Sequence, residues 1–265
     1  MAMKALFGLL ERPFKNGTVL KGQYKIASFL GKGSYGIAYE AYNLRENEEV
    51  VIKQLRRRKG FNASLNAFKR EAAMLQKLNH PSIPKFIDYF QEGKHYMLVM
   101  EHIKGKNFED LIFHEGQVYD EKTSFSILLN VLEIVNYFHK QGVVHRDLRI
   151  PNIMMKNGRI YIIDFGLARF INDRKQCDMK KMTEEKKLFR DISFKSDFYA
   201  LGHFVLFLLY SSYEPLSTSE NSWENELKLG KQTKSIIRRM LQIDEPYETA
   251  EELIREVQDC LFLLT

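Results

Sequence analysis

The spacing of apolar residues predicts strands in the first part of the chain and helices in the second. Short apolar runs separated by turn residues are typical of strands. One such run, Tyr24–Tyr42, flanks the glycine-rich turn Gly31–Gly36, and two more strands are expected at Lys85–Phe90 and His95–Met100 around Gly93. Later in the chain, apolar residues recur every three or four positions over long stretches, which is helical spacing.

Two charged residues stand out in the first part. The predicted strand Glu49–Leu55 has three β-branched residues before Lys53, which on an edge strand would simply point to solvent. The predicted helix Ser64–Leu78 has Ser64 as its expected N-cap, and Glu71 lies beside its apolar stripe.

The second part contains the longer helices. A short helix is expected at Phe108–Glu115, a long one at Asp120–Gly142 with Asp120 as its N-cap, and a very apolar one at Ser196–Leu209. Further helices follow from Thr233–Leu241 to the end of the chain. Near the end of the long helix, His139 is interpreted as a residue of the polar face.

The stretch from His145 to Gly166 carries the candidate chemistry. Asp147 and Asn152 stand five positions apart in a turn, and Asp164 follows the apolar run Ile160–Ile163. Two carboxylates and an amide at the ends of short strands can hold a divalent metal on a polyphosphate and orient a hydroxyl towards it. The alternative is that each Asp only caps a turn. His145 has no partner at a zinc-like spacing, so we interpret it as a packed histidine.

Composition and charge narrow the possible binding partners and cellular locations of the protein. The 265 residues carry a net charge of +6, but Lys and Arg are spread along the chain, which does not favour nucleic acid binding. Two cysteines, Cys177 and Cys260, form no recognisable framework, so a reducing cytoplasm is expected. No apolar run reaches membrane-spanning length, and the short apolar segment Ala5–Leu10 is expected to pack on the protein body.

The HRD sequence at Asp147, the spacing to Asn152 and the DFG sequence at Asp164 together resemble the eukaryotic-like (Hanks-type) protein kinases, in their compact bacterial Ser/Thr form. The resemblance extends from about Tyr24 to Leu253. It implies an α+β, two-lobe fold: an antiparallel β lobe with one helix at about 24–101 and a mainly helical lobe at about 104–265, after an N-terminal extension at 1–23. It also implies ATP in the cleft between the lobes and a protein substrate.

The resemblance assigns roles to individual residues. Asp147 would be the catalytic base, Arg149 would face the transferring phosphoryl group, and Glu71 would hold Lys53 on the α- and β-phosphates. Asn152 and Asp164 would hold Mg²⁺ or Mn²⁺. The residues expected to contact ATP are Leu30, Gly31, Lys32, Gly33, Ser34, Tyr35, Gly36, Ile37, Ala38, Lys53, Met100, Glu101, Ile103 and Met154. The resemblance further implies that Asp197 supports the backbone of the catalytic loop.

The sequence also departs from the family pattern. No Ala-Pro precedes Glu185, Tyr247 stands where the family usually has an Arg partner for that Glu, and few residues separate the very apolar helix from Thr233. These changes leave two alternatives open: a small-molecule (antibiotic-type) phosphotransferase and a pseudokinase scaffold. Ser/Thr members of the family usually carry Lys where this chain has Arg149, and some tyrosine kinases carry Arg there. Ser/Thr specificity is the expectation, because the compact chain resembles bacterial Hanks-type kinases.

A regulatory hypothesis concerns the interval between Asp164 and Asp197. In the family, the Arg beside the catalytic Asp, here Arg146, commonly receives a phosphate from this interval, and Thr183 or Ser193 could carry it. The simpler interpretation is a solvated basic loop. The physiological substrate and the oligomeric state are not indicated by the sequence.

Overall fold

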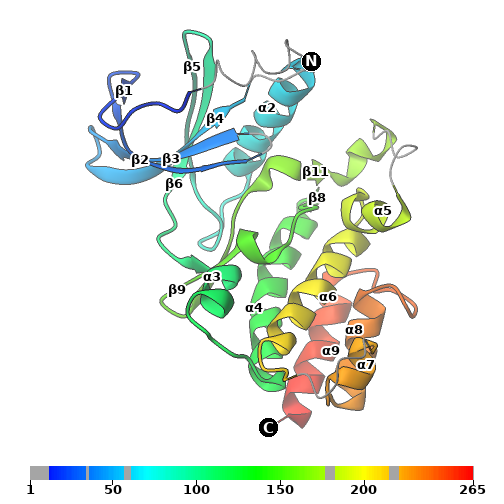
Figure 1. The fold of residues 1–265 in the computed structure, drawn as a ribbon. Coiled ribbons are helices and arrows are strands. Elements are labelled where there is room, and N and C mark those ends of the chain that lie inside the picture. Colours follow the sequence, from blue (N-terminus) through cyan, green and yellow to red (C-terminus); the bar gives the residue numbers. More distant parts are fainter. Residues whose placement is uncertain (1–11, 34–35, 57–60, 177–182, 215–220, 265) are drawn as a thin grey trace, which may run out of the picture. The chain divides into compact units, whose positions relative to one another are not determined.

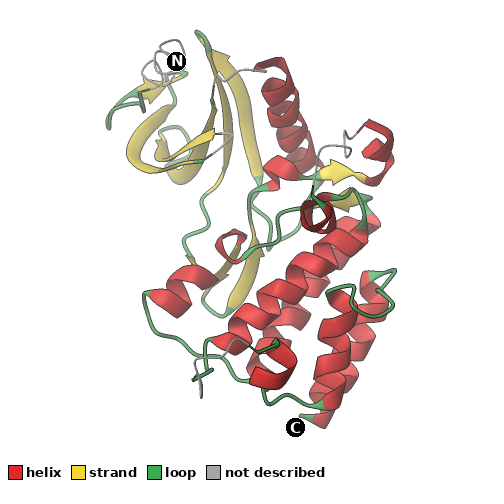
Figure 2. Cartoon of the chain, turned by 45° about the vertical axis from the view of Figure 1, so that its right-hand side comes forward, coloured by secondary structure: helices red, strands yellow, loops and turns green. Residues whose placement is uncertain are grey.

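A computed structural model describes residues 12–33, 36–56, 61–176, 183–214 and 221–264. The chain forms two compact units, Met1–Lys104 and Gly105–Thr265. Most strands belong to the first unit and most helices to the second (Figures 1 and 2). This is the α+β composition that the sequence predicts.

The first unit contains a six-stranded antiparallel sheet in the order β1-β2-β3-β4-β6-β5. Its elements are β1 (Val19–Leu20), β2 (Tyr24–Lys32), β3 (Gly36–Asn43), β4 (Glu48–Leu55), α2 (Phe61–Lys77), β5 (Phe86–Glu92) and β6 (His95–Glu101). The predicted hairpin around the glycine-rich turn is therefore confirmed as β2–β3, and β5–β6 is the second predicted hairpin. Because β4 lies between β3 and β6, Lys53 is on an interior strand.

The sheet curls around a core of aliphatic and aromatic side chains. Within it, Tyr24 stacks on Phe90 with ring centroids 5.7 Å apart, and the buried Tyr39 hydroxyl donates to Gln54 Oε1 at 2.7 Å. Preceding the sheet, Phe14 packs against Tyr39 and His95. The predicted docking of Ala5–Leu10 concerns residues outside those that the structure describes.

Helix α2 corrects one expectation. It begins at Phe61, so Ser64 lies inside the helix and is not its N-cap. The Phe61 ring lies 6.1 Å from that of Tyr96 on β6, and this tertiary contact favours a helix that starts before the local capping signal. The predicted placement of Glu71 holds: it is buried on the face that also carries Phe68 and Leu75.

The second unit is mainly helical. Its helices are α3 (Phe108–Phe113), α4 (Glu121–Lys140), α5 (Glu184–Arg190), α6 (Phe194–Tyr210), α7 (Trp223–Glu226), α8 (Lys231–Met240) and α9 (Ala250–Leu263). α6 is buried over most of its length and contacts α4, α5 and α8, while α9 packs on α4 and α8. A helix that is apolar nearly all round belongs in the centre of a bundle, as its sequence predicts.

Short strands and 3₁₀ turns connect these helices. They are β7 (Lys106–Asn107), β8 (Val143–Val144), η1 (Ile150–Asn152), β9 (Ile153–Lys156), β10 (Arg159–Ile162), η2 (Phe165–Leu167), β11 (Arg169–Phe170) and η3 (Ile171–Gln176). β9 pairs with β10 and β7, and β8 pairs with β11. His145 directly follows β8, and Asp164 follows β10 by two residues.

The segment between α6 and α8 is short, as the sequence predicts. Among the described residues, the four-residue α7 is the one helix between α6 and α8. Tyr247 lies between α8 and α9 and is buried, with its hydroxyl donating to Glu256 at 2.7 Å and its ring 3.8 Å from the Arg239 guanidinium. Tyr247 therefore has its own partners in the C-terminal helices.

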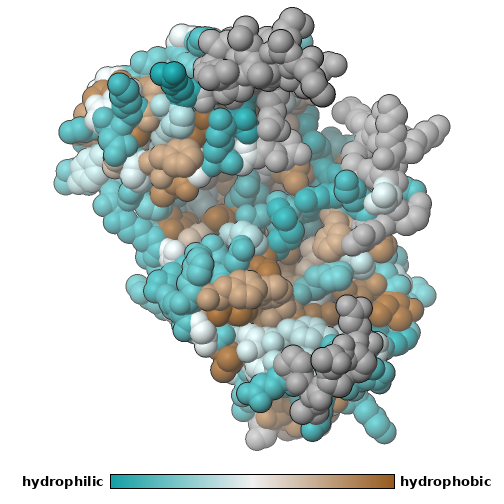
Figure 3. Space-filling model, in the orientation of Figure 1, coloured by the Kyte–Doolittle hydropathy of each residue, from teal (hydrophilic) through white to brown (hydrophobic). Residues whose placement is uncertain are grey.

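The surface in Figure 3 is mostly hydrophilic, with scattered apolar patches. Among the described residues, no helix combines the length and apolar character that crossing a membrane requires.

The start of α4 yields a prediction about stability. The Asp120 carboxylate accepts a hydrogen bond from Thr123 N at 2.8 Å, and hydrogen bonds from Thr123 lower the pKa of Asp120 below its ordinary value of 3.8. Asp120→Ala should therefore reduce the free energy of unfolding by about 1 kcal/mol at pH 7, whereas Asp120→Asn, which also caps well, should stay near wild type. Urea unfolding measures both.

The lowered pKa of Asp120 also determines how its contribution to stability changes with pH. The stabilisation by the Asp120 carboxylate is fully present above pH 3.8 and disappears as the pH falls through the lower pKa of the folded state. The difference between wild type and Asp120→Ala should shrink accordingly in acid. A difference that stays constant down to pH 2 would contradict the assigned capping bond.

Candidate active site

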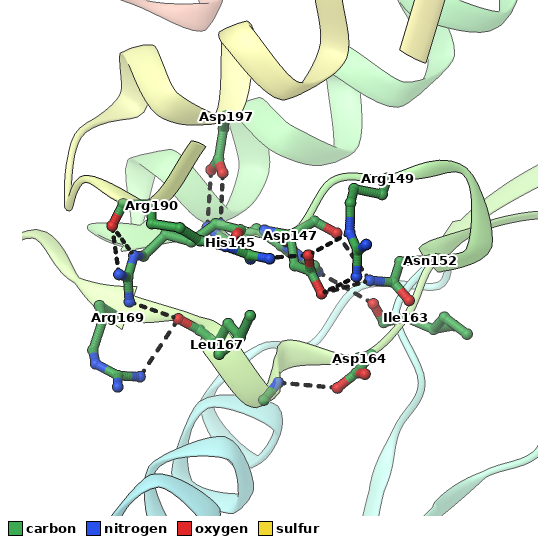
Figure 4. A network of polar contacts seen from close by, with 12 residues as sticks. His145, Asp147, Arg149, Asn152, Ile163, Asp164, Leu167, Arg169, Arg190 and Asp197 are labelled. Atoms are coloured by element: carbon green, nitrogen blue, oxygen red, sulfur yellow. Dashed lines mark hydrogen bonds and ion pairs between the residues drawn. The ribbon is translucent and has the colours of Figure 1, made fainter. Parts of the chain in front are cut away.

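The backbone of the loop between β8 and η1 is held by one buried carboxylate. Asp197, fully buried on α6, accepts hydrogen bonds from His145 N at 2.9 Å and Arg146 N at 2.7 Å. Arg146 has φ = 65°, a left-handed conformation that is unfavourable for a side chain of this size. The two bonds to Asp197 hold this conformation, so the expected support of the catalytic loop by Asp197 is observed (Figure 4).

His145 is packed, as predicted. It is fully buried against Phe138 and Phe165, its Nδ1 accepts a bond from Asp147 N at 3.3 Å, and its Nε2 donates to Ile163 O at 3.2 Å. These roles belong to the neutral ring protonated on Nε2. Burial lowers the pKa of His145, against the raising effect of Asp197, Asp147 and Asp164.

The structure brings Asp147, Arg149 and Asn152 together. Arg149 Nε donates to Asp147 Oδ1 at 2.7 Å, and Asn152 Nδ2 donates to Asp147 Oδ2 at 3.1 Å and to its backbone oxygen at 2.9 Å. The Asp147 side chain is only 8% exposed, whereas that of Arg149 is 57% exposed. A positioned carboxylate next to an exposed cation can take a proton from a hydroxyl beside an anionic group.

The β9–β10 hairpin aligns Asn152 with Asp164. Asn152 precedes β9, Ile163 follows β10, and Ile163 N donates to Asn152 O at 3.0 Å. Asp164 comes next, with φ = 61° and an exposed carboxylate that also accepts a bond from Gly166 N at 3.2 Å. The two predicted metal ligands therefore leave the same end of one hairpin, as Figure 4 shows.

The donor set fits a hard divalent cation. Because the Asn152 amide nitrogen donates to Asp147, the amide oxygen points away from Asp147 and is oriented for another partner. That oxygen and the exposed Asp164 carboxylate are the ligand types that Mg²⁺ and Mn²⁺ prefer.

In the first unit, Lys53 and Glu71 form the predicted ion pair. Lys53 Nζ lies 2.6 Å from Glu71 Oε1, and the side chains are 14% and 3% exposed. Gly36 on β3 leaves room for this lysine, since a Cβ at Gly36 would lie 3.0 Å from Lys53 Cγ. Removing one partner of such a buried pair leaves an uncompensated charge, so both positions are constrained together.

Besides Lys53 on β4, the residues predicted to contact ATP occupy three segments. The glycine-rich segment ends β2 and begins β3, with Gly33 N donating to Gly36 O at 2.9 Å, while Ser34 and Tyr35 lie outside the described residues. Met100 and Glu101 end β6, and Glu101 N donates to Lys85 O at 2.9 Å. Met154 lies on β9 in the second unit. Contact with ATP stays a prediction for all of them.

The interval between Asp164 and Asp197 contains helix α5. Thr183 is its N-cap, with Oγ1 accepting from Lys186 N at 3.3 Å. Arg146 does not extend into solvent: it is buried, and its guanidinium donates to the backbone oxygens of Arg190 and Leu167. Phosphorylation of Thr183 or Ser193 stays a prediction.

His139 was misread from the sequence. It is buried, its Nε2 lies 2.9 Å from Asp197 Oδ2, and its ring stacks on Phe194 at 4.1 Å. The sequence did contain a signal for the burial of His139, because this residue continues the buried stripe of Leu132 and Val135 at helical spacing. A second residue, Arg190 on α5, contacts Asp147 Oδ1 at 2.9 Å and had no sequence signal.

The neutral state of His145 yields a prediction. Its folded pKa lies below the ordinary value of 6.5, so the unfolded chain takes up the proton first and wild-type stability falls as the pH drops below about 6.5. One such group contributes a slope of at most about 1.4 kcal/mol per pH unit. His145→Phe should show a shallower fall than wild type between pH 7.5 and 5.5 in urea unfolding, even if its stability is lower throughout. Equal slopes would contradict a buried neutral His145.

Comparison with known proteins places the chain in a family. A family model described as the protein kinase domain matches residues 24–263. The chain is similar to the "Probable serine/threonine-protein kinase YbdM" of Bacillus subtilis (strain 168), with 38% identity over 264 residues, 97% of this chain and 99% of that protein. It is also similar to "Serine/threonine-protein kinase B" of Synechocystis, with 27% identity over 270 residues, 90% of this chain and 47% of that protein.

A third relative, the "Probable serine/threonine-protein kinase SCO3848" of Streptomyces coelicolor, is 31% identical over 173 residues, 62% of this chain and 24% of that protein. The chain thus spans nearly all of the Bacillus relative and less than half of the other two. The domain match covers most of the chain, and the Bacillus protein aligns with almost all of it. This chain therefore belongs to the protein kinase family.

Proposed function

We propose that this protein kinase transfers the γ-phosphoryl group of ATP to Ser or Thr hydroxyls of protein substrates, with Asp147 as the catalytic base. The observation that carries the proposal is the arrangement around Asp147. Its carboxylate is fixed by Arg149 and Asn152 on a loop whose backbone is held by Asp197. Phosphoryl transfer depends mainly on positioning and electrostatics, which is what such a fixed carboxylate provides.

In the proposed reaction, Asp147 orients the acceptor hydroxyl and takes its proton as the oxygen attacks the γ-phosphorus and ADP leaves. Arg149, whose side chain is more than half exposed, stabilises the negative charge of the transferring group. Lys53, held by Glu71 at 2.6 Å, contacts the α- and β-phosphates. These roles are supported by the match of each residue to the family motif.

Asn152 and Asp164 would hold Mg²⁺ or Mn²⁺. The bound cation would neutralise charge on the ATP phosphates and fix their orientation. The chain's own contribution is the β9–β10 hairpin, which presents both oxygen ligands from one end.

The choice of Ser and Thr rests on the relatives. All three are named as serine/threonine kinases, and the Bacillus protein aligns over almost its full length. A cytoplasmic location is part of the proposal, supported by the unpaired, buried thiol of Cys260, which suits a reducing compartment.

The first test removes the proposed base. Asp147→Asn should lower phosphoryl transfer by about 10²–10⁴-fold, because the amide cannot accept the hydroxyl proton. Transfer of radiolabelled phosphate from ATP measures this, followed by mapping of the labelled residues. The control Asp110→Asn removes an exposed carboxylate on α3 and should leave turnover unchanged. Undiminished turnover in Asp147→Asn would reject the role of this residue, and labelled Tyr would reject the Ser/Thr assignment.

The second test concerns the metal ligands. Asp164→Ala should weaken ATP binding in the presence of Mg²⁺ more than binding in chelator, because only the first requires the carboxylate. Calorimetric titration with ATP under both conditions measures the difference, with Asp259→Ala on the exposed side of α9 as control. A ligand role for Asp164 is excluded when both conditions lose affinity equally.

A further inference from the structure

The C-terminal end of α5 and the catalytic loop hold each other through two arginines. Arg146 Nε donates to the backbone oxygen of Arg190 at 2.7 Å, and Arg190 Nη1 donates in return to the backbone oxygen of Arg146. Arg146 Nη1 also donates to Leu167 O at 3.1 Å. The last turn of α5 is therefore fixed on the loop that carries Asp147 through backbone carbonyl groups.

This docking places the Arg190 side chain on the proposed base. Arg190 Nη1 lies 2.9 Å from Asp147 Oδ1, the same oxygen that accepts from Arg149 Nε. In Figure 4, Arg190 and Arg149 reach Asp147 from opposite sides.

The Asp147 carboxylate has no acceptor position left. A carboxylate offers about four lone-pair sites. Oδ1 accepts from Arg149 Nε at 2.7 Å and from Arg190 Nη1 at 2.9 Å. Oδ2 accepts from Asn152 Nδ2 at 3.1 Å and from Arg149 Nη2 at 3.4 Å. An acceptor hydroxyl that must donate to this carboxylate has to displace one of these donors.

Of the three described residues that donate to the Asp147 carboxylate, Arg190 is the one outside the kinase sequence motif, so its displacement leaves the contacts of the motif in place. Arg149 and Asn152 are next to Asp147 in the catalytic loop and match the family motif, whereas Arg190 comes from α5, 43 positions further along the chain. Its side chain is 26% exposed, so it can rotate towards solvent. The helix itself can stay in place, because Phe189 packs on Tyr199 and His203 of α6.

We propose that Arg190 is an autoinhibitory residue, which occupies the position of the acceptor hydroxyl on Asp147 until its guanidinium is displaced. The proposal rests on the proposed function, since it requires Asp147 to be the group that receives the hydroxyl. It gives α5 a regulatory role in a chain that lacks the usual Ala-Pro-Glu end of this segment.

Arg190→Met tests the proposal, because methionine keeps an unbranched apolar stem and removes every donor. Phosphoryl transfer from ATP to dephosphorylated casein should rise about tenfold in kcat/KM for casein, the factor expected when one charge-assisted hydrogen bond no longer has to break. The KM for ATP should not change. Lys186→Met is the matched control: it removes an exposed cation from the same helix and should behave as wild type. A purely structural role of Arg190 would not raise kcat/KM.

Arg190→Lys covers the case in which Arg190→Met fails to fold. Its shorter, single ammonium cannot serve both Arg146 O and Asp147 as the guanidinium does, so a smaller rise is expected. Turnover equal to or below wild type in the folded variants overturns autoinhibition.

The double variant Asp147→Asn/Arg190→Met separates the two proposals. If Asp147 is the base, the gain from Arg190→Met is lost in the double variant and activity falls below wild type. A loss in Asp147→Asn without a gain in Arg190→Met rejects the autoinhibitory role alone. A gain in Arg190→Met that persists in the double variant rejects Asp147 as the base, and with it the proposed mechanism.

Discussion

The catalytic loop depends on the buried carboxylate of Asp197. It accepts hydrogen bonds from two successive backbone amides, His145 N and Arg146 N, and from the ring of His139. A buried charge is tolerated only when it is well hydrogen-bonded, and three donors satisfy this one. In return, Asp197 fixes Arg146 in a left-handed conformation that would otherwise cost of order 1–3 kcal/mol. The central helix α6 thereby sets the geometry of the residues next to Asp147.

Arg146 and Asn152 connect this loop to the segments around it. The turn at Arg146 directs its guanidinium to the carbonyls of Leu167 and Arg190, which fixes both ends of the interval between Asp164 and Asp197. Beyond the turn, Asn152 bonds to Asp147 and its backbone oxygen accepts from Ile163 N, so the β9–β10 hairpin stays in register with the loop. Hydrogen bonds thus connect the proposed base to Asn152 and Asn152 to Ile163, the residue directly before Asp164.

In the first unit, a buried ion pair fixes the position of Lys53. Lys53 lies on an interior strand and its ammonium is paired with a carboxylate that is almost fully buried. Such a pair adds little net stability, because desolvation of two charges offsets their attraction, but it fixes the ammonium in one place. A fixed cation is what binding of a polyphosphate requires.

The sequence by itself determined the order of strands and helices, the family and the residues of the motifs. Alternation in the β2–β3 hairpin and helical spacing in α4 and α6 are local signals, and the two sides of each motif are close in the chain. Asp120 as the cap of α4 and Glu71 on the buried side of α2 could therefore be predicted. The support by Asp197 was expected only from the resemblance to the kinase family, because the amides that it binds are 51 and 52 positions away.

Only the tertiary structure decided which polar groups meet across long separations. His139 and Asp197 are 58 positions apart, and Arg190 and Asp147 are 43 apart, so no local pattern links them. The interval between Asp164 and Asp197 is rich in Lys and Arg, which is typical of a solvated loop, and the docking of α5 within it depends on carbonyls that any sequence would offer. In the same way, the ring of Phe61 meets Tyr96 only in the folded unit and moves the start of α2 ahead of Ser64. Local propensities are weak compared with such contacts, which is the physical reason that these features could not be read from the chain.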